Sequence, residues 1–167
     1  MPFYVMGLAG MLVSILVLGW KAWGPEILIN ETPSEPLGLY RIIAHDLPDY
    51  RRGMTVVFPV PSAFRTLVYG RRWLRGGMPL LKQIGALAGD RVCIFTHRFA
   101  INGRTLGPVF TVDSSGRPLP EIRGCFEVKP GDFFAASLHL DKSFDGRYFG
   151  VLPLSQLQGE ARPLWTF

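Results

Sequence analysis

The chain begins with a long stretch that contains no charged side chain, and this stretch limits the folds open to it more than any other feature. The stretch runs from Pro2 to Trp20 and holds 19 residues. As a helix rising ~1.5 Å per residue, it would extend roughly 28 Å, close to the ~30 Å hydrocarbon core of a bilayer. Lys21 and Trp23 follow Trp20, and such cationic and aromatic side chains are typical of the membrane interface. We therefore predict an N-terminal membrane anchor over residues 1–24.

Two other interpretations of this segment stay open. A cleavable signal peptide would carry a positive n-region and a cleavage site of small residues. Here only the α-amino group is positive at the start, and Trp23 and Pro25 crowd the place where cleavage would occur. A helix buried in a protein core is the third interpretation. The positive-inside rule does not orient the segment, because the nearest cationic side chains all follow it.

Beyond Trp23 the chain shows no long helical period, and short apolar stretches alternate with turn residues. Its 167 residues include 19 glycines and 14 prolines, spread along the sequence. Many short strands separated by turns are typical of an all-β barrel or sandwich. We expect residues 25–167 to form one mainly β domain, with a hairpin turn at Asn102-Gly103 and a short helix within 62–75. The predicted strands cover residues 27–29, 39–44, 53–59, 91–95, 99–101, 121–128 and 132–136.

Composition and charge exclude several classes of protein. The chain is 48% hydrophobic and only 19% charged, which excludes a disordered protein. Its net charge of +5 is not gathered on a basic, aromatic-rich surface, so we expect no nucleic-acid partner. The best basic cluster, residues 71–75, suits a solvated loop or a contact with anionic lipid. The three histidines show no zinc spacing, and we expect neither a metal nor a cofactor.

Ser34 lies in a segment where Pro33 and Pro36 fix φ on both sides. Such a segment is stiff and can hold a side chain in position at low entropic cost. A serine hydroxyl becomes an effective nucleophile only when a base takes its proton. From these residues alone, an ordinary serine in a turn is the more common interpretation.

Lys82 lies among apolar neighbours, with Leu80 and Leu81 before it and Ile84 shortly after it. An ordinary lysine, with a pKa of ≈ 10.4, is almost fully protonated at neutral pH. Burial disfavours the ammonium ion and lowers the pKa, so that a buried lysine can act as a base. A lysine at a sheet edge that reaches into solvent stays the alternative.

Ser34 and Lys82 lie in two of four sequence boxes that follow one another in a recognisable order. Residues 30–38 read Asn-Glu-Thr-Pro-Ser-Glu-Pro-Leu-Gly, and residues 53–58 read Gly-Met-Thr-Val-Val-Phe. Residues 82–90 read Lys-Gln-Ile-Gly-Ala-Leu-Ala-Gly-Asp, and residues 143–150 read Ser-Phe-Asp-Gly-Arg-Tyr-Phe-Gly. Together they resemble the boxes of the type I signal peptidase family. The first box, with Glu35 after the serine and a proline next, resembles the conjugative-transfer branch, the TraF-type pilin-maturation peptidases.

The chain departs from the family pattern at two single positions and in one longer stretch. Met54 stands where the second box usually has an acidic residue, and Gln83 stands where the third usually has arginine. The family's Gly-Asp-Asn-x-x-Asn stretch before the last box is missing, and residues 137–142 take its place.

The resemblance implies a serine endopeptidase with a signal-peptidase-like β domain. Ser34 would be the nucleophile and Lys82 its general base. Thr32 and the backbone N–H of Ser34 would hold the oxyanion. Ser143 would hydrogen-bond and orient Lys82. Asp145 and Arg147 would form a supporting ion pair.

The resemblance also implies a cellular location and a substrate. The anchor would lie in the inner membrane with the catalytic domain in the periplasm, and the substrate would be a membrane-inserted pilin precursor. TraF-type relatives also cyclise pilin head to tail, and the wider family favours small residues at the cut. A general signal peptidase for secreted preproteins is one alternative. A non-enzymatic, membrane-tethered assembly protein of a conjugation or secretion apparatus is another.

Two further points stay open at this stage. Cys93 and Cys125 are the only cysteines, and a disulfide between them would close a loop of 32 residues in an oxidising compartment. Two buried thiols are the alternative. A Ser-His-Asp triad that uses His139 and Asp141 is also open, because the members of a triad meet in space rather than in sequence.

Overall fold

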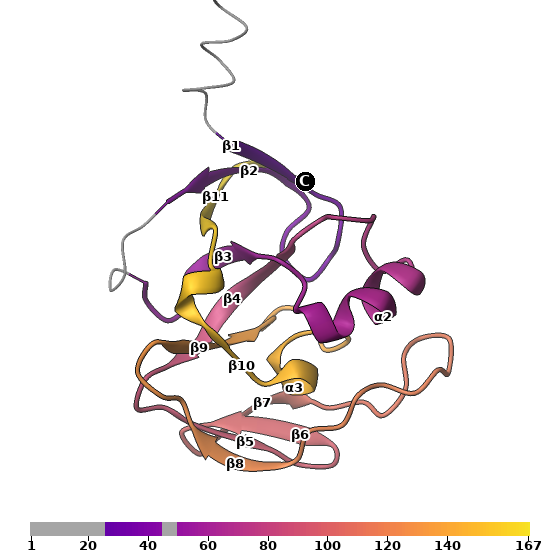
Figure 1. Ribbon diagram of the computed structural model, residues 1–167, viewed down its shortest axis with the longest axis vertical. Coiled ribbons are helices and arrows are strands. Elements are labelled where there is room, and N and C mark those ends of the chain that lie inside the picture. Colours follow the sequence, from indigo (N-terminus) through magenta and orange to yellow (C-terminus); the bar gives the residue numbers. More distant parts are fainter. Residues whose placement is uncertain (1–25, 45–49) are drawn as a thin grey trace, which may run out of the picture.

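The computed structural model describes residues 26–44 and 50–167, and most of this part of the chain is β structure (Figure 1). The strands are β1 (Glu26–Asn30), β2 (Gly38–Ile43), β3 (Thr55–Phe58), β4 (Leu80–Leu87), β5 (Arg91–Ile94), β6 (Arg98–Ile101), β7 (Arg104–Pro108), β8 (Gly124–Glu127), β9 (Asp132–Ala136), β10 (Val151–Pro153) and β11 (Gly159–Thr166). They form a seven-stranded sheet in the order β1-β2-β11-β3-β4-β9-β10 and a four-stranded sheet in the order β7-β6-β5-β8. The prediction of a mainly β chain is confirmed.

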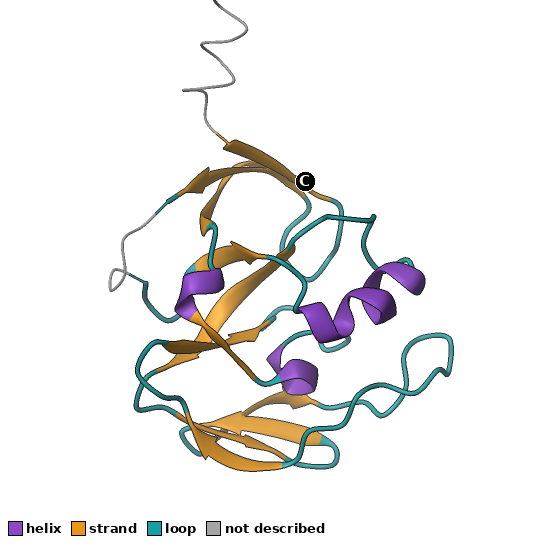
Figure 2. Ribbon diagram, in the orientation of Figure 1, coloured by secondary structure: helices purple, strands orange, loops and turns teal. Residues whose placement is uncertain are grey.

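The helices are short and occupy little of the chain (Figure 2). A 3-10 turn, η1 (Ser62–Phe64), leads directly into α2 (Arg65–Gly70), which confirms the short helix expected within residues 62–75. The others are α3 (Gly146–Phe149) and the 3-10 turn η2 (Leu154–Gln156).

The predicted hairpin between β6 and β7 is present. Asn102 and Gly103 have φ values of 51° and 81°, so both adopt the left-handed conformation of a tight two-residue hairpin turn. The predicted strands correspond to β1, β2, β3, β5, β6, β8 and β9, with ends that differ by at most three residues.

Four strands, β4, β7, β10 and β11, are missing from the predicted list, and for the last three the reasons are identifiable. β7 carries a glycine and a proline, and β10 has only three residues, so neither gives a clear alternating pattern. β11 contains Pro163, and its pairing with β2 shifts register between Pro163 and Trp165. Proline is confined to bulges and edges because it lacks a backbone donor.

The main core lies between the larger sheet and the helices. Phe58 of β3 and Phe133 of β9 are fully buried and meet edge to face with ring centroids 5.4 Å apart. Phe149 of α3 packs against Phe58 at 6.3 Å. These contacts fix β3, β9 and α3 around β4, the strand that carries Lys82.

The predicted anchor and its domain boundary fall on residues 1–24, outside the part of the chain that is described. Among the residues that are described, no helix is both long and apolar enough to cross a membrane. The anchor therefore stays a prediction.

Candidate active site

The loop between β1 and β2, which carries Ser34, folds around the buried side chain of Asn30. The Asn30 amide nitrogen donates to the carbonyl oxygens of Thr32, Glu35 and Pro36 at 2.9, 3.0 and 3.0 Å. Its Oδ1 accepts from the Thr32 backbone N–H at 3.2 Å and from Thr32 Oγ1 at 3.0 Å. One side chain thus satisfies polar groups on both sides of Ser34 and holds the loop in a single shape.

A residue that directly follows β9 fastens the same loop at another point. Ser137, just after β9, donates from Oγ to the backbone oxygen of Ser34 at 2.6 Å. The Ser137 backbone N–H donates to Asp145 Oδ2 at 2.9 Å. Ser137 was missed by the sequence analysis, because it stands in the stretch where the family pattern is absent.

Lys82 lies within β4, opposite Val56 of β3, and its residue is only 4% exposed. Burial is the largest influence on its ammonium group and lowers the pKa of Lys82 to about 8, although the charges of Asp145 and Glu35 act in the opposite direction. With such a pKa, about one molecule in ten holds a neutral Lys82 at pH 7. Lys82 is therefore not a lysine that reaches from a sheet edge into solvent.

Glu35 is a second residue that the sequence analysis missed as a member of the site. Its side chain is buried, and its Oε1 has no hydrogen-bond partner among the described residues. Burial raises the pKa of Glu35 to about 7, while the positive charge of Lys82 and a hydrogen bond with Gln83 lower it. The apolar sequence around Lys82 gave no sign that the fold brings this carboxyl group within its electrostatic reach.

Asp145 and Arg147 form a fully buried ion pair beside the site. Arg147 Nε donates to Asp145 Oδ1, and Arg147 Nη2 donates to Asp145 Oδ2, both at 2.8 Å. Asp145 also caps α3 by accepting from the backbone N–H of Arg147 at 3.1 Å. Arg147 Nη1 reaches the carbonyl oxygens of Pro108 and Asp141 at 2.9 and 2.8 Å. The pair thus joins the end of β7, the loop before α3 and α3 itself.

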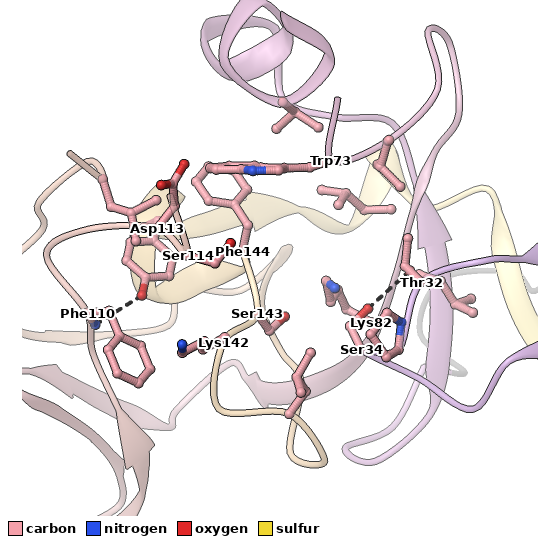
Figure 3. Close-up of a pocket in the computed structure, with 18 of the residues that line it drawn as sticks. Thr32, Ser34, Trp73, Lys82, Phe110, Asp113, Ser114, Lys142, Ser143 and Phe144 are labelled. Atoms are coloured by element: carbon pink, nitrogen blue, oxygen red, sulfur yellow. Dashed lines mark hydrogen bonds between the residues drawn. The ribbon is translucent and has the colours of Figure 1, made fainter. Parts of the chain in front are cut away.

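Ser143 is buried and lines the same pocket as Lys82. Figure 3 shows its hydroxyl on the side of the pocket that faces Lys82 and Ser34. Ser143 Oγ has no hydrogen-bond partner among the described residues, so the bond to Lys82 that the resemblance implies is not formed in this structure.

Of these residues, Thr32, Ser34, Lys82 and Ser143 line one pocket of about 260 Å³ (Figure 3). At one end Thr32 Oγ1 lies 3.5 Å from Ser34 Oγ. The polar residues at this end supply a hydroxyl, an amine of lowered pKa and further hydroxyl donors, a set suited to acyl transfer. The residues that line the pocket are Thr32, Pro33, Ser34, Val68, Trp73, Leu74, Leu80, Leu81, Lys82, Phe110, Val112, Asp113, Ser114, Leu119, Leu140, Lys142, Ser143, Phe144 and Tyr148.

The histidine alternative finds less support in the geometry. His139 is exposed, and its Nε2 lies 2.9 Å from the side-chain nitrogen of Gln83. Neither His139 nor Asp141 lines the pocket that holds Ser34. The structure therefore gives this pair no shared pocket with Ser34.

Cys93 and Cys125 form a disulfide between β5 and β8, where the two residues are direct partners in the ladder. The bond crosslinks the smaller sheet, and neither cysteine lines the pocket.

The chain is similar in sequence to several known proteins. A sequence model of the family described as signal peptidase, peptidase S26, matches residues 4–165. The conjugal transfer protein TraF of Agrobacterium fabrum is 36% identical over 97% of this chain and 94% of that protein. A plasmid transfer protein TraF of Escherichia coli is 29% identical over 91% of this chain and 90% of that protein. Among solved structures, a signal peptidase I of Enterococcus faecalis superposes with a TM-score of 0.41 and 20% identity, covering 69% of this chain and 98% of the other.

Proposed function

Because the chain belongs to the signal peptidase family, peptidase S26, we propose that it is a serine endopeptidase in which Ser34 and Lys82 form the catalytic dyad. The observation that carries this proposal is the shared pocket of the two residues. Both are 4% exposed, both line the pocket, and burial lowers the pKa of Lys82 to about 8. A lysine that served only as a solvated surface charge would be exposed and would keep its ordinary pKa.

The reaction begins with proton transfer. Neutral Lys82 accepts the hydroxyl proton of Ser34 as Ser34 Oγ attacks the carbonyl carbon of the substrate peptide bond. The carbonyl oxygen becomes an oxyanion, which the backbone N–H of Ser34 and the Thr32 hydroxyl hold. Thr32 Oγ1 donates to Asn30 in the free protein, so it turns from Asn30 to the oxyanion when substrate binds.

The ammonium of Lys82 then returns its proton to the nitrogen of the leaving peptide, and the C–N bond breaks. Ser34 is left as an ester of the new carboxyl end of the substrate. Water, losing its proton to Lys82, attacks this ester and frees the product, and Lys82 returns that proton to Ser34 Oγ. An α-amino group of the same substrate chain, in the place of water, would instead give a cyclic product.

Around this dyad, the remaining polar residues position groups and do not react. The buried pair of Asp145 and Arg147 holds the loop that bears Ser143. Ser143 Oγ, which has no hydrogen-bond partner among the described residues, is available to orient the amine of Lys82. Ser137 and Asn30 hold the backbone of the Ser34 loop.

For the client, we propose a pilin precursor of a conjugative apparatus, since relatives that span nearly the whole chain carry the names of conjugal and plasmid transfer proteins. Residues 1–24 would anchor the protein in the inner membrane with its catalytic domain in the periplasm. Ser34 follows Lys21 by only 13 residues, which would keep the site close to the bilayer. The disulfide supports a periplasmic placement, because disulfides persist in oxidising compartments.

The test is cleavage of the pilin precursor from the same gene cluster by the purified full chain in detergent. We expect a product of defined mass with wild-type protein and none with Ser34→Ala. Accumulation of secreted preproteins, rather than pilin precursor, on loss of the gene would identify a general signal peptidase. Failure of an acylating serine-reactive probe to label Ser34, together with no cleavage, would favour the assembly protein.

A further inference from the structure

Glu35 carries a buried carboxyl group that the proposed reaction does not use. The residue directly follows Ser34 in the chain, and only 2% of it is exposed. Its backbone oxygen accepts from the amide nitrogen of Asn30 at 3.0 Å, which fixes where its side chain leaves the loop. Its Oε1 has no hydrogen-bond partner among the described residues. A buried carboxylate oxygen without a donor is costly unless a positive charge acts on it.

That positive charge is the ammonium form of Lys82. Burial has the largest effect on both groups, and the charge of each opposes that effect on the other: Lys82 lowers the pKa of Glu35, and Glu35 raises the pKa of Lys82. Within residues 26–44 and 50–167, Glu35 forms no direct ion pair. No contact with a cation therefore neutralises its charge, which acts on Lys82 through space.

Asp145 acts on Lys82 more strongly than Glu35, but its charge is already paired. Its two oxygens accept from Arg147 Nε and Nη2, both at 2.8 Å. Arg147 in turn lowers the pKa of Lys82, so the two charges of this pair act on the amine in opposite directions. The charge of Glu35 has no such partner, and an ammonium formed at Lys82 meets it in full.

Gln83, the residue after Lys82 in β4, holds the Glu35 side chain without neutralising it. Burial raises the pKa of Glu35 to about 7, and a hydrogen bond with Gln83 opposes this rise. The Gln83 amide nitrogen also lies 2.9 Å from His139 Nε2, so the amide is held from a second side. Gln83 stands where the family pattern usually has arginine. An arginine would pair with Glu35 and take up its charge, whereas a glutamine donates without a charge of its own.

Tyr40, on the neighbouring strand β2, is a further titratable group that faces Glu35. Burial and then the charge of Glu35 raise the pKa of Tyr40. The Tyr40 hydroxyl donates to the backbone oxygen of Pro36 at 2.7 Å, so its proton is engaged there. Tyr40 therefore does not take the place of Lys82 as the partner of the carboxylate.

We propose that Glu35 is a positioning residue that stabilises the ammonium of Lys82 as it forms during the attack by Ser34, and that Gln83 holds the Glu35 carboxylate in place for this role. The proton moves from Ser34 Oγ to Lys82 Nζ, and Glu35 stays ionised and exchanges no proton. The aspartate of a Ser-His-Asp triad stabilises its imidazolium in the same way. The inference rests on the proposed dyad of Ser34 and Lys82 and adds a third member to it.

The test is kcat as a function of pH, measured with the pilin precursor and the purified full chain in detergent. Glu35→Gln keeps the shape of the side chain and removes its charge. At pH well above the ascending limb, where Lys82 is neutral in both proteins, we expect kcat to fall about threefold to tenfold, because a less stabilised ammonium makes a weaker base. Glu35→Asp keeps a carboxylate and should recover part of this loss. A merely structural role would lower the melting temperature and leave the pH profile in place.

A double-mutant cycle tests the part of Gln83. Gln83→Leu should lower kcat in the wild-type background and add little in the Glu35→Gln background, because both changes act on one carboxylate. The matched control is Gln158→Leu, at an exposed glutamine, which should retain the wild-type kcat. Thermal melting identifies the folded variants.

Three results would each overturn the inference alone. They are a wild-type kcat above the limb in folded Glu35→Gln, equal losses in Glu35→Asp and Glu35→Gln, and an effect of Gln83→Leu that is the same in both backgrounds. Cleavage that persists in Ser34→Ala would instead overturn the dyad on which the inference rests.

Discussion

Ser137 Oγ donates a hydrogen bond of 2.6 Å to the backbone carbonyl oxygen of Ser34, although the two residues lie 103 positions apart in the chain. Both residues are buried. The Ser137 N–H is held in turn by Asp145, which is paired with Arg147. The loop that carries Ser34, the proposed nucleophile, is therefore fastened to the end of β9 and, through it, to α3.

Ser137→Ala should lower kcat more than it raises KM. The change leaves the buried oxygen of Ser34 without its donor and lets the loop shift, and a shift of about 1 Å costs roughly 10²-fold in rate. Steady-state kinetics on the pilin precursor measures the effect. Ser137→Thr keeps a hydroxyl and should recover part of the rate, and Ser155→Ala, at an exposed serine, should change nothing. A wild-type kcat in Ser137→Ala would show that Ser137 does not position Ser34.

Ser34→Ala and Lys82→Ala should each abolish cleavage, and the double variant should be little worse than either one, because the two groups act as a unit. Lys82→Arg should also be inactive, since a guanidinium stays protonated and cannot take the serine proton. Precursor cleavage on a gel measures all four variants. Lys129→Arg, at an exposed lysine, is the matched control and should retain activity. Substantial cleavage by Lys82→Arg would show that Lys82 provides only charge.

Cleavage should rise with pH as Lys82 loses its proton, with the ascending limb of kcat/KM centred near the pKa of about 8. The charge of Glu35 raises the pKa of Lys82, so Glu35→Gln removes that influence and should move the limb to lower pH. Glu127→Gln, at an exposed carboxylate, should leave the limb in place. If the ascending limb stays fixed in Glu35→Gln, the charge of Glu35 does not influence the pKa of Lys82. An ascending limb centred near pH 6.5 that vanishes in His139→Ala would identify His139 as the base.

Much of the fold follows from local patterns, whereas the surroundings of Ser34 and Lys82 do not. The Asn102-Gly103 turn could be predicted because its residues tolerate the left-handed backbone that the turn requires. Glu35 and Ser137 gave no such signal, since their importance comes from contacts with residues far away in the chain. Lys82 could be singled out by its apolar neighbours, but its burial depends on how β3, β4 and the Ser34 loop pack together.

Thr32→Val should slow turnover far more than it weakens substrate binding. Valine keeps the shape of threonine but removes the hydroxyl that would hold the oxyanion, and loss of one such donor costs ~10²–10³ in kcat. The change also removes the bond from Thr32 Oγ1 to Asn30 Oδ1, so Thr32→Ser, which keeps the hydroxyl, is the informative comparison. Single-turnover rates and KM with the same precursor decide between the roles. A change in KM alone would place Thr32 outside the oxyanion site.

Asp145→Asn should destabilise the folded protein strongly, because it removes one partner of an ion pair whose side chains are 0% and 1% exposed. The guanidinium of Arg147 would then be a buried charge without its counter-ion, which typically costs about 3–5 kcal/mol. The midpoint and slope of urea unfolding give the change in the free energy of unfolding. The matched control is Glu121→Gln, which removes an exposed carboxylate from its pair with Arg123 and should leave the midpoint almost unchanged. Equal, small shifts in both variants would mean that Asp145 and Arg147 do not hold the loop of Ser143 through their charges.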